Sequence, residues 1–546
     1  MTEERTLQDQ VHILIDGESA PDLLLQGLMR VAVEQGLHLP SLCTLRVQDD
    51  DLSLVDSATL DVGRSLVVQM GSGRELRRAF EGEITGLELE PTPAGTLTLV
   101  VRAYDRSHRL HRGRKTQSYQ QMTDSDLATR IAREAGLDPD VESTSEVYEY
   151  VLQDNRTPYE FLRERAERIG FAFWVSEGKL HFRRPAARPP EPIPLEWGHT
   201  LHQFHPVLSA CRQVDEVLVR GWDPLQKRPI VGRATRGRAA PELGEQRTGS
   251  ELARQAFGSA SVLVVDRPVS TQGEADTLAQ ALADQLSAEF VRAEARCAGD
   301  ARLCPGALVE IRNVGQRFSG KYYVTRAVHS FGQRGVYQTE LTVAGNQTQT
   351  LFDLLQPPAG RSLWIGPALV TDNRDPAGMG RIKVQIPWLG DQVESTWARP
   401  AVPMAGSERG IFFLPEVGDE VLVTFEHGDV NHPYVLGALW NGREEPPNAA
   451  SAVNRAGQVV QRVIRTRAGH TILLDDTDGG GGITIEDRSG NKIYLDTARN
   501  TLRIEVLQDV TIEAQGKVAI KALTGIDLEA SGGQVNVKGI IVNLNS

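Results

Sequence analysis

Three histidines stand close together in the stretch HTLHQFH, at His199, His202 and His205. Imidazole nitrogens are common ligands of zinc and other transition metals, so three of them on a suitable turn could hold one ion. No cysteine accompanies them, and the stretch follows the proline-rich segment RRPAARPPEPIP (residues 183–194), which is typical of a stiff connector. We therefore favour surface or packing histidines over a metal site.

The acidic run DDTDGGGG (residues 475–482) has the composition of a calcium-binding loop. Its carboxylates do not follow the alternate spacing that an EF-hand loop needs before its glycine, so a flexible acidic turn is the better interpretation. The sequence contains no GxSxG, HExxH or GxxxxGKS/T motif, the marks of serine hydrolases, zinc proteases and phosphate-binding loops. We therefore predict no enzymatic activity, no catalytic residue, no metal and no cofactor.

The charge balance makes nucleic acid an unsuitable main partner. The chain has a formal net charge of −13, whereas phosphate binding requires a concentrated basic surface. The densest basic stretch, residues 102–115, includes His108 and His111 and is more simply a solvated strand end and loop. The segments LPEVGDE and FEHGD, in the most barrel-like part of the chain, are acidic. We therefore predict no nucleic-acid partner.

The cysteines and the N-terminus indicate where the protein is made. The four cysteines, Cys43, Cys211, Cys297 and Cys304, are too scattered for a disulfide framework, and Cys297–Cys304 is only a weak candidate pair. The first residues, MTEERTLQDQ, are polar and acidic, and no run reaches the roughly 18 apolar residues of a spanning helix. We expect synthesis in the cytoplasm without a signal peptide.

Alternation of apolar and polar residues over most of the chain predicts antiparallel β structure. Period-two runs separated by turn residues predict a first β-barrel over residues 1–110. Two helices follow within an α+β segment, residues 111–185, and their N-caps are Thr123 and Thr157, each followed by an acidic residue three positions later. Over residues 186–360 the pattern predicts a second β-barrel, interrupted by one helix whose N-cap is Thr271, with Glu274 three positions later.

Short apolar strands continue to residue 442. RIKVQIPW and EVLVTF alternate, and some eighty residues of such strands suit a small closed barrel, so we expect an OB-like fold over residues 361–442. A polar linker, residues 443–482, separates this barrel from the C-terminal stretch.

Residues 483–546 repeat an apolar pair about every eight residues. The pairs are Ile483/Ile485, Ile493/Leu495, Leu502/Ile504, Val510/Ile512, Val518/Ile520, Ile526/Leu528, Val535/Val537 and Val542/Leu544. Each strand is too short to close a core around itself, and repeats of this kind bury their apolar face only by stacking on neighbours. A trimeric β-helix satisfies the pattern most simply, because three chains would share one apolar axis. We place six residues on that axis: Val510, Ile512, Val518, Ile520, Ile526 and Leu528.

Several segments resemble the VgrG-type spikes of contractile injection systems. DPAGMGRIKVQIPW (375–388), STWARP (395–400), PMAG (403–406) and LPEVGDEVLVTFEHGDVNHPYVLGALWNG (414–442) are similar to the baseplate-V or spike OB domain of that family. SYQQMTDSDLATRIAREAGL (118–137) and DNRTPYEFLRERAERIGFAFW (154–174) are similar to its tail-hub domain. The resemblance covers nearly the whole chain. The PMAG and WARP motifs are more similar to the spikes of extracellular, phage-like injection particles than to type VI secretion spikes.

The resemblance implies a mainly β homotrimer with tandem hub β-barrels, an α+β insertion, an OB-fold barrel and a C-terminal intertwined β-helix. Such a trimer would be the structural hub and spike of an injection particle that acts at or outside the cell surface. It would cap a hexameric inner tube and contact the target membrane transiently while puncturing it. Further partners would be baseplate proteins, cargo effectors and a PAAR-type tip protein docked on Val542, Asn543, Leu544 and Asn545.

Three alternatives stay open. A type VI secretion VgrG or a phage tail spike would carry the same order of domains. A spike with cell-wall hydrolase activity would need a catalytic insertion, but only the linker lies between the OB segment and the repeats. A nucleic-acid-binding OB protein would explain neither the acidic balance nor the repeats. Some phage spikes also hold iron on paired histidines at the tip, and here no His or Cys follows His470.

Overall fold

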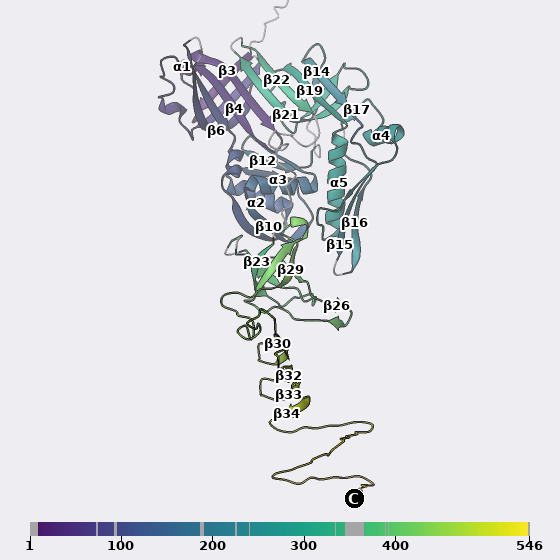
Figure 1. The fold of residues 1–546 in the computed structure, drawn as a ribbon. Coiled ribbons are helices and arrows are strands. Elements are labelled where there is room, and N and C mark those ends of the chain that lie inside the picture. The colour runs from purple at the N-terminus through teal and green to yellow at the C-terminus, as the bar shows by residue number, and fades with distance from the viewer. Residues whose placement is uncertain are drawn as a thin grey trace, which may run out of the picture. The chain divides into compact units, whose positions relative to one another are not determined.

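Strands dominate the protein, which divides into two compact units, Met1–Leu439 and Trp440–Ser546 (Figure 1). The computed structural model describes residues 9–72, 75–91, 95–185, 191–223, 226–239, 241–332, 335–343, 365–387, 389–390 and 393–543. We call residues 9–343 the body, residues 365–439 the small β domain and residues 440–543 the repeat unit. None of the helices in the described ranges is long and apolar enough to cross a membrane.

One sheet of fourteen strands organises the body. Its strands are β1 (Asp9–Ile15), β2 (Glu18–Ser19), β3 (Leu28–Gly36), β4 (Leu39–Gln48), β5 (Ser65–Ser72), β6 (Glu75–Pro91), β7 (Leu97–Tyr104), β13 (Ile193–Glu196), β14 (Leu201–Leu208), β17 (Glu242–Leu243), β19 (Val291–Ala298), β20 (Leu308–Arg312), β21 (Gly320–Gly332) and β22 (Tyr337–Val343). The main path runs β14-β19-β22-β21-β3-β4-β7-β6-β5-β1-β2, and β13, β17 and β20 are attached beside it. β21 pairs antiparallel with β3, so the two β regions predicted as tandem barrels are hydrogen-bonded into one sheet.

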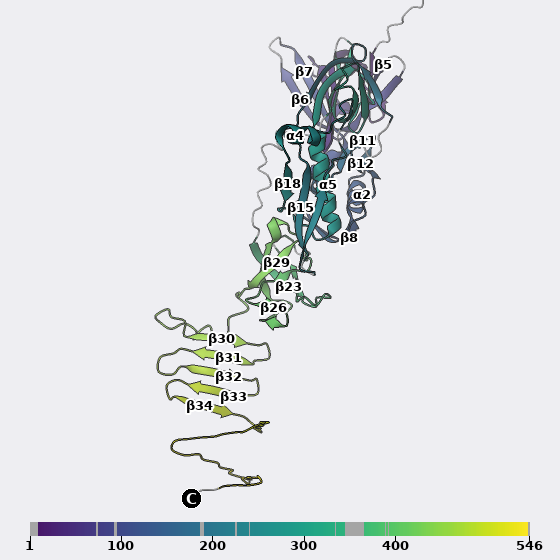
Figure 2. The ribbon, with the colours of Figure 1, turned by 90° about the vertical axis from the view of Figure 1, so that its right-hand side faces the viewer.

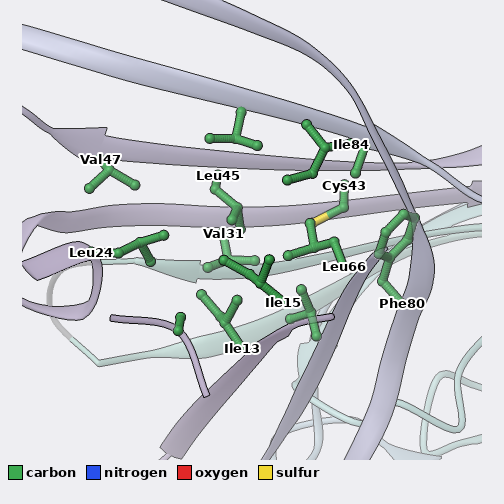
Figure 3. Packing of buried hydrophobic residues seen from close by; sticks show 14 of the residues in the cluster. Ile13, Ile15, Leu24, Val31, Cys43, Leu45, Val47, Leu66, Phe80 and Ile84 are labelled. Carbon is green, nitrogen blue, oxygen red and sulfur yellow. The ribbon is translucent and has the colours of Figure 1, made fainter. Parts of the chain in front are cut away.

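Each half of this sheet has its own apolar core. The first is built by the inward residues of β1 and its neighbours, among them Ile13, Val31, Cys43, Leu45, Leu66 and Phe80 (Figure 3). The second contains Leu201, Val291, Cys297, Tyr322 and Leu341. Both cores follow the period-two alternation in the sequence, because alternate residues of a strand share a face. A short helix, α1 (Asp22–Gly27), and a 3₁₀ turn, η1 (Ala58–Leu60), add Leu24 and Leu60 to the first core.

Two helices and two small sheets form the α+β part of the body. The elements are η2 (Arg106–His111), β8 (Lys115–Thr123), α2 (Asp124–Glu134), β9 (Asp138–Val141), β10 (Val147–Arg156), α3 (Pro158–Ile169), β11 (Ala172–Ser176) and β12 (Lys179–Arg183). Capping boxes start both helices, with Thr123 and Asp126 at α2 and Thr157 and Glu160 at α3. α3 ends at Gly170, whose φ of 71° is the left-handed conformation that glycine adopts most readily. The predicted starts of both helices are thereby confirmed.

A three-stranded sheet covered by a long helix extends the later half of the body. β15 (Glu216–Asp223), β16 (Arg228–Ala234) and β18 (Ser261–Val264) pack on α5 (Gln272–Ala288) through Val217, Val219 and Leu278. Thr271 caps α5 as predicted. The sequence predicts one helix here, and α4 (Gly249–Phe257) is a second one that was missed, although Thr248 and Glu251 form a capping box at its start.

The small β domain is a five-stranded sheet with a separate hairpin. The sheet has the order β24 (Lys383–Gln385), β23 (Ile365–Asp372), β28 (Glu420–Phe425), β29 (Pro433–Ala438) and β25 (Arg399–Pro400), and the hairpin pairs β26 (Ala405–Gly406) with β27 (Arg409–Gly410). A 3₁₀ turn, η3 (Glu426–Gly428), links β28 to β29. The core contains Ile382, Val384, Val421 and Val423. Leu152 of β10 is buried in the same core, so the body contributes a side chain to this domain.

The repeat unit begins earlier in the chain than predicted from the sequence. Its sheet is an antiparallel series of five strands, β30 (Gln461–Arg465), β31 (Thr471–Asp475), β32 (Gly482–Glu486), β33 (Lys492–Asp496) and β34 (Thr501–Glu505) (Figure 2). β30 and β31 lie in the stretch predicted as a polar linker, residues 443–482. Ile464 of β30 and the pair Ile472/Leu474 of β31 take the positions of the apolar pairs in the later strands, although Val463 and Leu473 interrupt the strict alternation. Each strand pairs with its neighbour over five residues.

Candidate assembly surface

Two columns of apolar side chains run along one face of the repeat-unit sheet. The register places Ile464 opposite Ile472, Ile472 opposite Ile485, Ile485 opposite Ile493 and Ile493 opposite Ile504. The second column joins Leu474, Ile483, Leu495 and Leu502. Side chains directly opposite one another on one face lie within contact distance, so each column is a continuous apolar ladder. We call these nine residues the apolar face.

The apolar face is exposed in the single chain. Ile485 is 48% exposed, whereas its neighbour Thr484, on the opposite side of the strand, is 8% exposed. The other members of the face are also among the exposed large hydrophobic residues. Contiguous exposed apolar surface of this kind marks an interaction site, because soluble proteins rarely leave it open to water. The face was predicted from Ile483 onward. Ile464, Ile472 and Leu474 were missed because Val463 and Leu473 break the alternation there, and the i, i+2 spacing of Ile472 and Leu474 was the available signal.

The six predicted axis residues lie beyond the last strand. Val510, Ile512, Val518, Ile520, Ile526 and Leu528 are all exposed, and the described residues from Val506 to Asn543 form no strand in the single chain. A short strand that makes no ladder hydrogen bonds gains too little to fix its backbone. A single chain therefore does not fold these eight-residue repeats into strands, and the structure does not bring the six side chains together.

The predicted tip-docking residues fall at the end of the described chain. Val542 and Asn543 are exposed, and Leu544 and Asn545 lie outside the described residues.

The candidate metal ligands and acidic run have ordinary structural surroundings. His202 and His205 are exposed on β14, and His199 is exposed in the turn before it. In the acidic run, Gln461 donates to Asp475 Oδ2 at 3.0 Å, and Arg462 pairs with Asp476 at 2.6 Å. Throughout the described part of the chain, no three His, Cys, Asp or Glu side chains are grouped to hold a metal ion.

The cysteines are free thiols, including the weakly predicted pair Cys297–Cys304. Cys297 Sγ donates to the carbonyl of Thr339 at 3.3 Å, which directs the thiol into its own sheet. Burial raises the pKa of the Cys297 thiol to about 12 and that of Cys304 to about 11, so both stay protonated near neutral pH. The possibility of a disulfide between them is therefore wrong for this structure.

One polar cluster has the order of groups found in a hydrolytic triad. His181 Nδ1 lies 2.7 Å from Asp140, and its Nε2 lies 2.7 Å from the hydroxyl of Ser176. Arg183 also binds Asp140, and the indole of Trp174 stacks on the imidazole with 4.9 Å between ring centroids. The guanidinium neutralises the carboxylate that would have to support a catalytic imidazolium. We interpret the cluster as a hydrogen-bond network that holds β9, β11 and β12 together, and we assign no reaction to it.

Two family models match this chain, one over most of the body and one over the small β domain. Residues 6–333 match the Alg8 N-terminal domain, and this match covers more than half of the chain. Residues 366–440 match the OB domain of type VI secretion system and phage-baseplate injectors, which corresponds to the small β domain.

Curated relatives share shorter stretches. The actin cross-linking toxin VgrG1 of Vibrio cholerae is 26% identical over 183 residues, which are 30% of this chain and 15% of the relative. The type VI secretion system spike protein VgrG5 of Pseudomonas aeruginosa is 34% identical over 161 residues, which are 27% of this chain and 18% of the relative. The chain therefore covers less than a fifth of each of these relatives.

Solved structures share the fold at low sequence identity. The Francisella PdpA–VgrG complex in its lidded form aligns with a TM-score of 0.56 at 8% identity, over 92% of this chain and 81% of that chain. An Escherichia coli component of the type VI secretion system, described as similar to the T4 bacteriophage tail proteins gp27 and gp5, aligns with a TM-score of 0.52 at 14% identity, over 78% of this chain and 99% of that one.

Proposed function

Because this chain belongs to the family of the Alg8 N-terminal domain and is a VgrG-like spike protein, we propose that three copies of it form the hub and spike of a contractile injection particle. The body would cap a hexameric inner tube, and the repeats would intertwine as a β-helix that points at the target membrane. The role is mechanical, with no enzymatic step. The alternative is a type VI secretion spike, which the names of the curated relatives favour.

The main support for this proposal is the exposed apolar face of the repeat unit. Nine apolar side chains stand in two columns on a sheet whose other face is largely polar. Burial of apolar surface stabilises an assembly by about 25 cal/mol per Å², so covering this face with the same face of other copies is strongly favourable. Two further copies would also supply strands beside the eight-residue repeats, where one chain leaves the backbone without ladder partners.

Trimerisation is the first prediction. Light scattering of the purified full-length protein at micromolar concentration should give three times the 59.9 kDa mass of one chain. The mass should not fall on dilution to the nanomolar range, because intertwined chains separate only by unfolding. A stable monomer would contradict both the β-helix and the spike. Electron microscopy of the same sample should show a threefold club with a thin stalk.

A separately encoded tip protein is the second prediction. The described residues from Val506 to Asn543 form no strand in the single chain, and open strand edges favour stacking of another β structure. We propose that Val542, Asn543, Leu544 and Asn545 bind a PAAR-type protein. Deleting residues 540–546 should abolish its co-purification while the mass of the trimer remains, because the upstream repeats are intact. Recovery of the tip protein with the truncated trimer would contradict the assignment.

The remaining partners follow from the same role. Baseplate proteins would surround the body, and cargo effectors would travel with the spike. We propose synthesis in the cytoplasm and action at or outside the cell surface once the particle is assembled. Particles recovered from culture medium with this protein bound would favour the extracellular kind, whereas its retention in a cell-anchored apparatus would favour type VI secretion.

A further inference from the structure

A hairpin of the small β domain carries apolar side chains that its own chain does not bury. We call residues 402–413 the arm; it follows β25 and contains β26 and β27 (Figure 1). Its large apolar side chains are all exposed: Val402, Met404, Ile411, Phe412 and Phe413. The two phenylalanines are 75% and 65% exposed, and neither belongs to the core of the small β domain. Large aromatic groups left in water in this way mark a contact surface.

The arm has a definite conformation despite this exposure. Ala405 pairs with Gly410, and the backbone N–H of Ile411 donates to the carbonyl oxygen of Met404 at 3.0 Å. Gly410 has a φ of 151° and approaches the same carbonyl so closely that a Cβ atom would lie 2.5 Å from its oxygen. A lone two-stranded hairpin is marginally stable in water. A surface that buries its apolar side chains would therefore stabilise the arm.

An apolar patch on the sheet of the same domain is also uncovered. Ile365, Pro367 and Leu369 alternate along β23 with buried residues, so the three side chains share one face of the strand. Leu422 of β28 lies opposite Pro367 and extends the patch across the next strand. Ile365 is 54% exposed, and Leu369 is exposed as well. We call these four residues the outer patch.

The arm and the outer patch do not cover one another within one chain, since both are exposed there. Leu439 ends the larger compact unit and Trp440 begins the repeat unit. Three copies that intertwine their repeats would thus hold three small β domains close together. A contact between the arm of one copy and the outer patch of another joins two different surfaces, and head-to-tail contacts of this kind form a ring when the rotation between copies closes.

We propose that the arm of each copy packs on the outer patch of the next copy, so that three small β domains form a closed ring. This inference rests on the proposed trimer and adds a second contact to it, separate from the apolar face of the repeat unit. Phe412 and Phe413 are its anchors, because a few large side chains, aromatic ones above all, carry most of the binding energy of an interface.

The ring would also determine how the repeats of the three chains align. Repeats of about eight residues look alike to one another, so a shift of one chain by a whole repeat still pairs apolar with apolar side chains. Register is weakly specified wherever a shifted pairing is nearly as good. Three linked domains directly before the repeats would start the three chains at the same level and exclude the shifted pairings.

Chemical cross-linking of the full-length protein tests the ring. Phe413→Cys and Leu369→Cys are combined in a chain that also carries Cys211→Ser, because Cys211 is an exposed free thiol. After treatment with a short bismaleimide and complete denaturation, the chains should run as covalent dimers and trimers in SDS gels, since each copy donates one arm and accepts another. Phe413→Cys without Leu369→Cys should give no covalent product. A covalent product in that variant would show that the arms meet one another, and would overturn the assignment.

A second thiol position and a mass measurement separate the ring from the trimer. Ser259→Cys combined with Leu369→Cys places the first thiol at an exposed position of the body and should leave single chains in the same gel. Light scattering before cross-linking reports on the proposed trimer itself. A trimer mass without covalent dimers in the arm and patch variant would overturn the ring and leave the proposed function intact. A monomer mass would contradict the proposed function and the ring with it.

Limited digestion with trypsin provides a second measurement, on an arm that is not altered. Trypsin cleaves after arginine, and Arg409 is an exposed residue of β27 that the next copy would cover. Leu369→Asp places a carboxylate in the outer patch, and cleavage after Arg409 should become about tenfold faster, the factor expected from the loss of one strong interface contact. Leu89→Asp changes a leucine of similar exposure in the body and should leave the rate unchanged. Equal rates in Leu369→Asp and the wild type would overturn the proposal.

Discussion

Replacing Ile493 by Asp should abolish the trimer. Ile493 lies within the first apolar column, between Ile485 on β32 and Ile504 on β34. If three chains cover one another's apolar faces, the substitution places three carboxylates together in an apolar interior without partners. Each unpaired buried charge costs several kcal/mol, and the three would also repel one another. The Ile493→Asp protein should be a monomer or an aggregate by light scattering and should lack the heat-resistant trimer band that we expect of the wild type in SDS gels.

Arg503 offers a matched control on the other face of the same sheet. It lies opposite Tyr494, and its side chain is 66% exposed. Arg503→Asp changes the charge of each chain by two, twice the change in Ile493→Asp, yet the side chain should remain in water. We expect a trimer with wild-type mass and heat resistance. Equal loss of the trimer in both variants would mean that the sheet does not associate through its apolar face.

The sequence predicted those parts of the fold that depend on local patterns. The starts of α2, α3 and α5 followed from a threonine cap with an acidic residue three positions later, because that pair satisfies helix N–H groups without any distant contact. The same signal stands at Thr248, and α4 was missed because its nine residues carry a short apolar stripe in a segment already assigned to strands. Strand alternation at Ile13 and Ile382 likewise predicted burial correctly.

Pairing between strands that lie far apart in the sequence could not be predicted from local patterns. The hydrogen bonds between β3 and β21 connect residues nearly 300 positions apart, and nothing in either strand specifies the other as its neighbour. The burial of Leu152 in the small β domain is another contact of this kind. Val151 and Leu152 are adjacent and both buried, and nothing in β10 specifies which part of the chain covers each side chain. At the candidate site, the apolar pairs from Ile483 to Ile504 were found from their spacing. Their alignment into two columns depends on the register of turns between strands, which the spacing alone does not fix.

A buried ion pair in the α+β part of the body determines the largest expected effect on stability. Arg165 of α3 lies 2.5 Å from Asp124 at the start of α2, and their side chains are 8% and 2% exposed. Tyr148 of β10 donates to the same carboxylate at 3.1 Å, and the guanidinium lies 4.2 Å from the centre of the Tyr148 ring. The pair therefore connects both helices to β10, the strand that carries Tyr150 and Leu152 to the small β domain.

Arg165→Met should destabilise this part of the body by about 3–5 kcal/mol, because it leaves the Asp124 carboxylate buried with only a tyrosine hydroxyl as partner. Native-state hydrogen exchange of the slowest amides in α2 and α3 measures that free energy in the full-length protein. Arg163→Met is the control on the same helix: its partner Glu167 lies 2.9 Å away on a more exposed surface, and the loss should stay below about 1 kcal/mol. In the double variant Arg165→Met/Asp124→Leu most of the stability should return, because two apolar groups replace the charges and no carboxylate remains buried alone. A loss that persists unchanged in the double variant would assign the effect to packing of the arginine stem rather than to the ion pair.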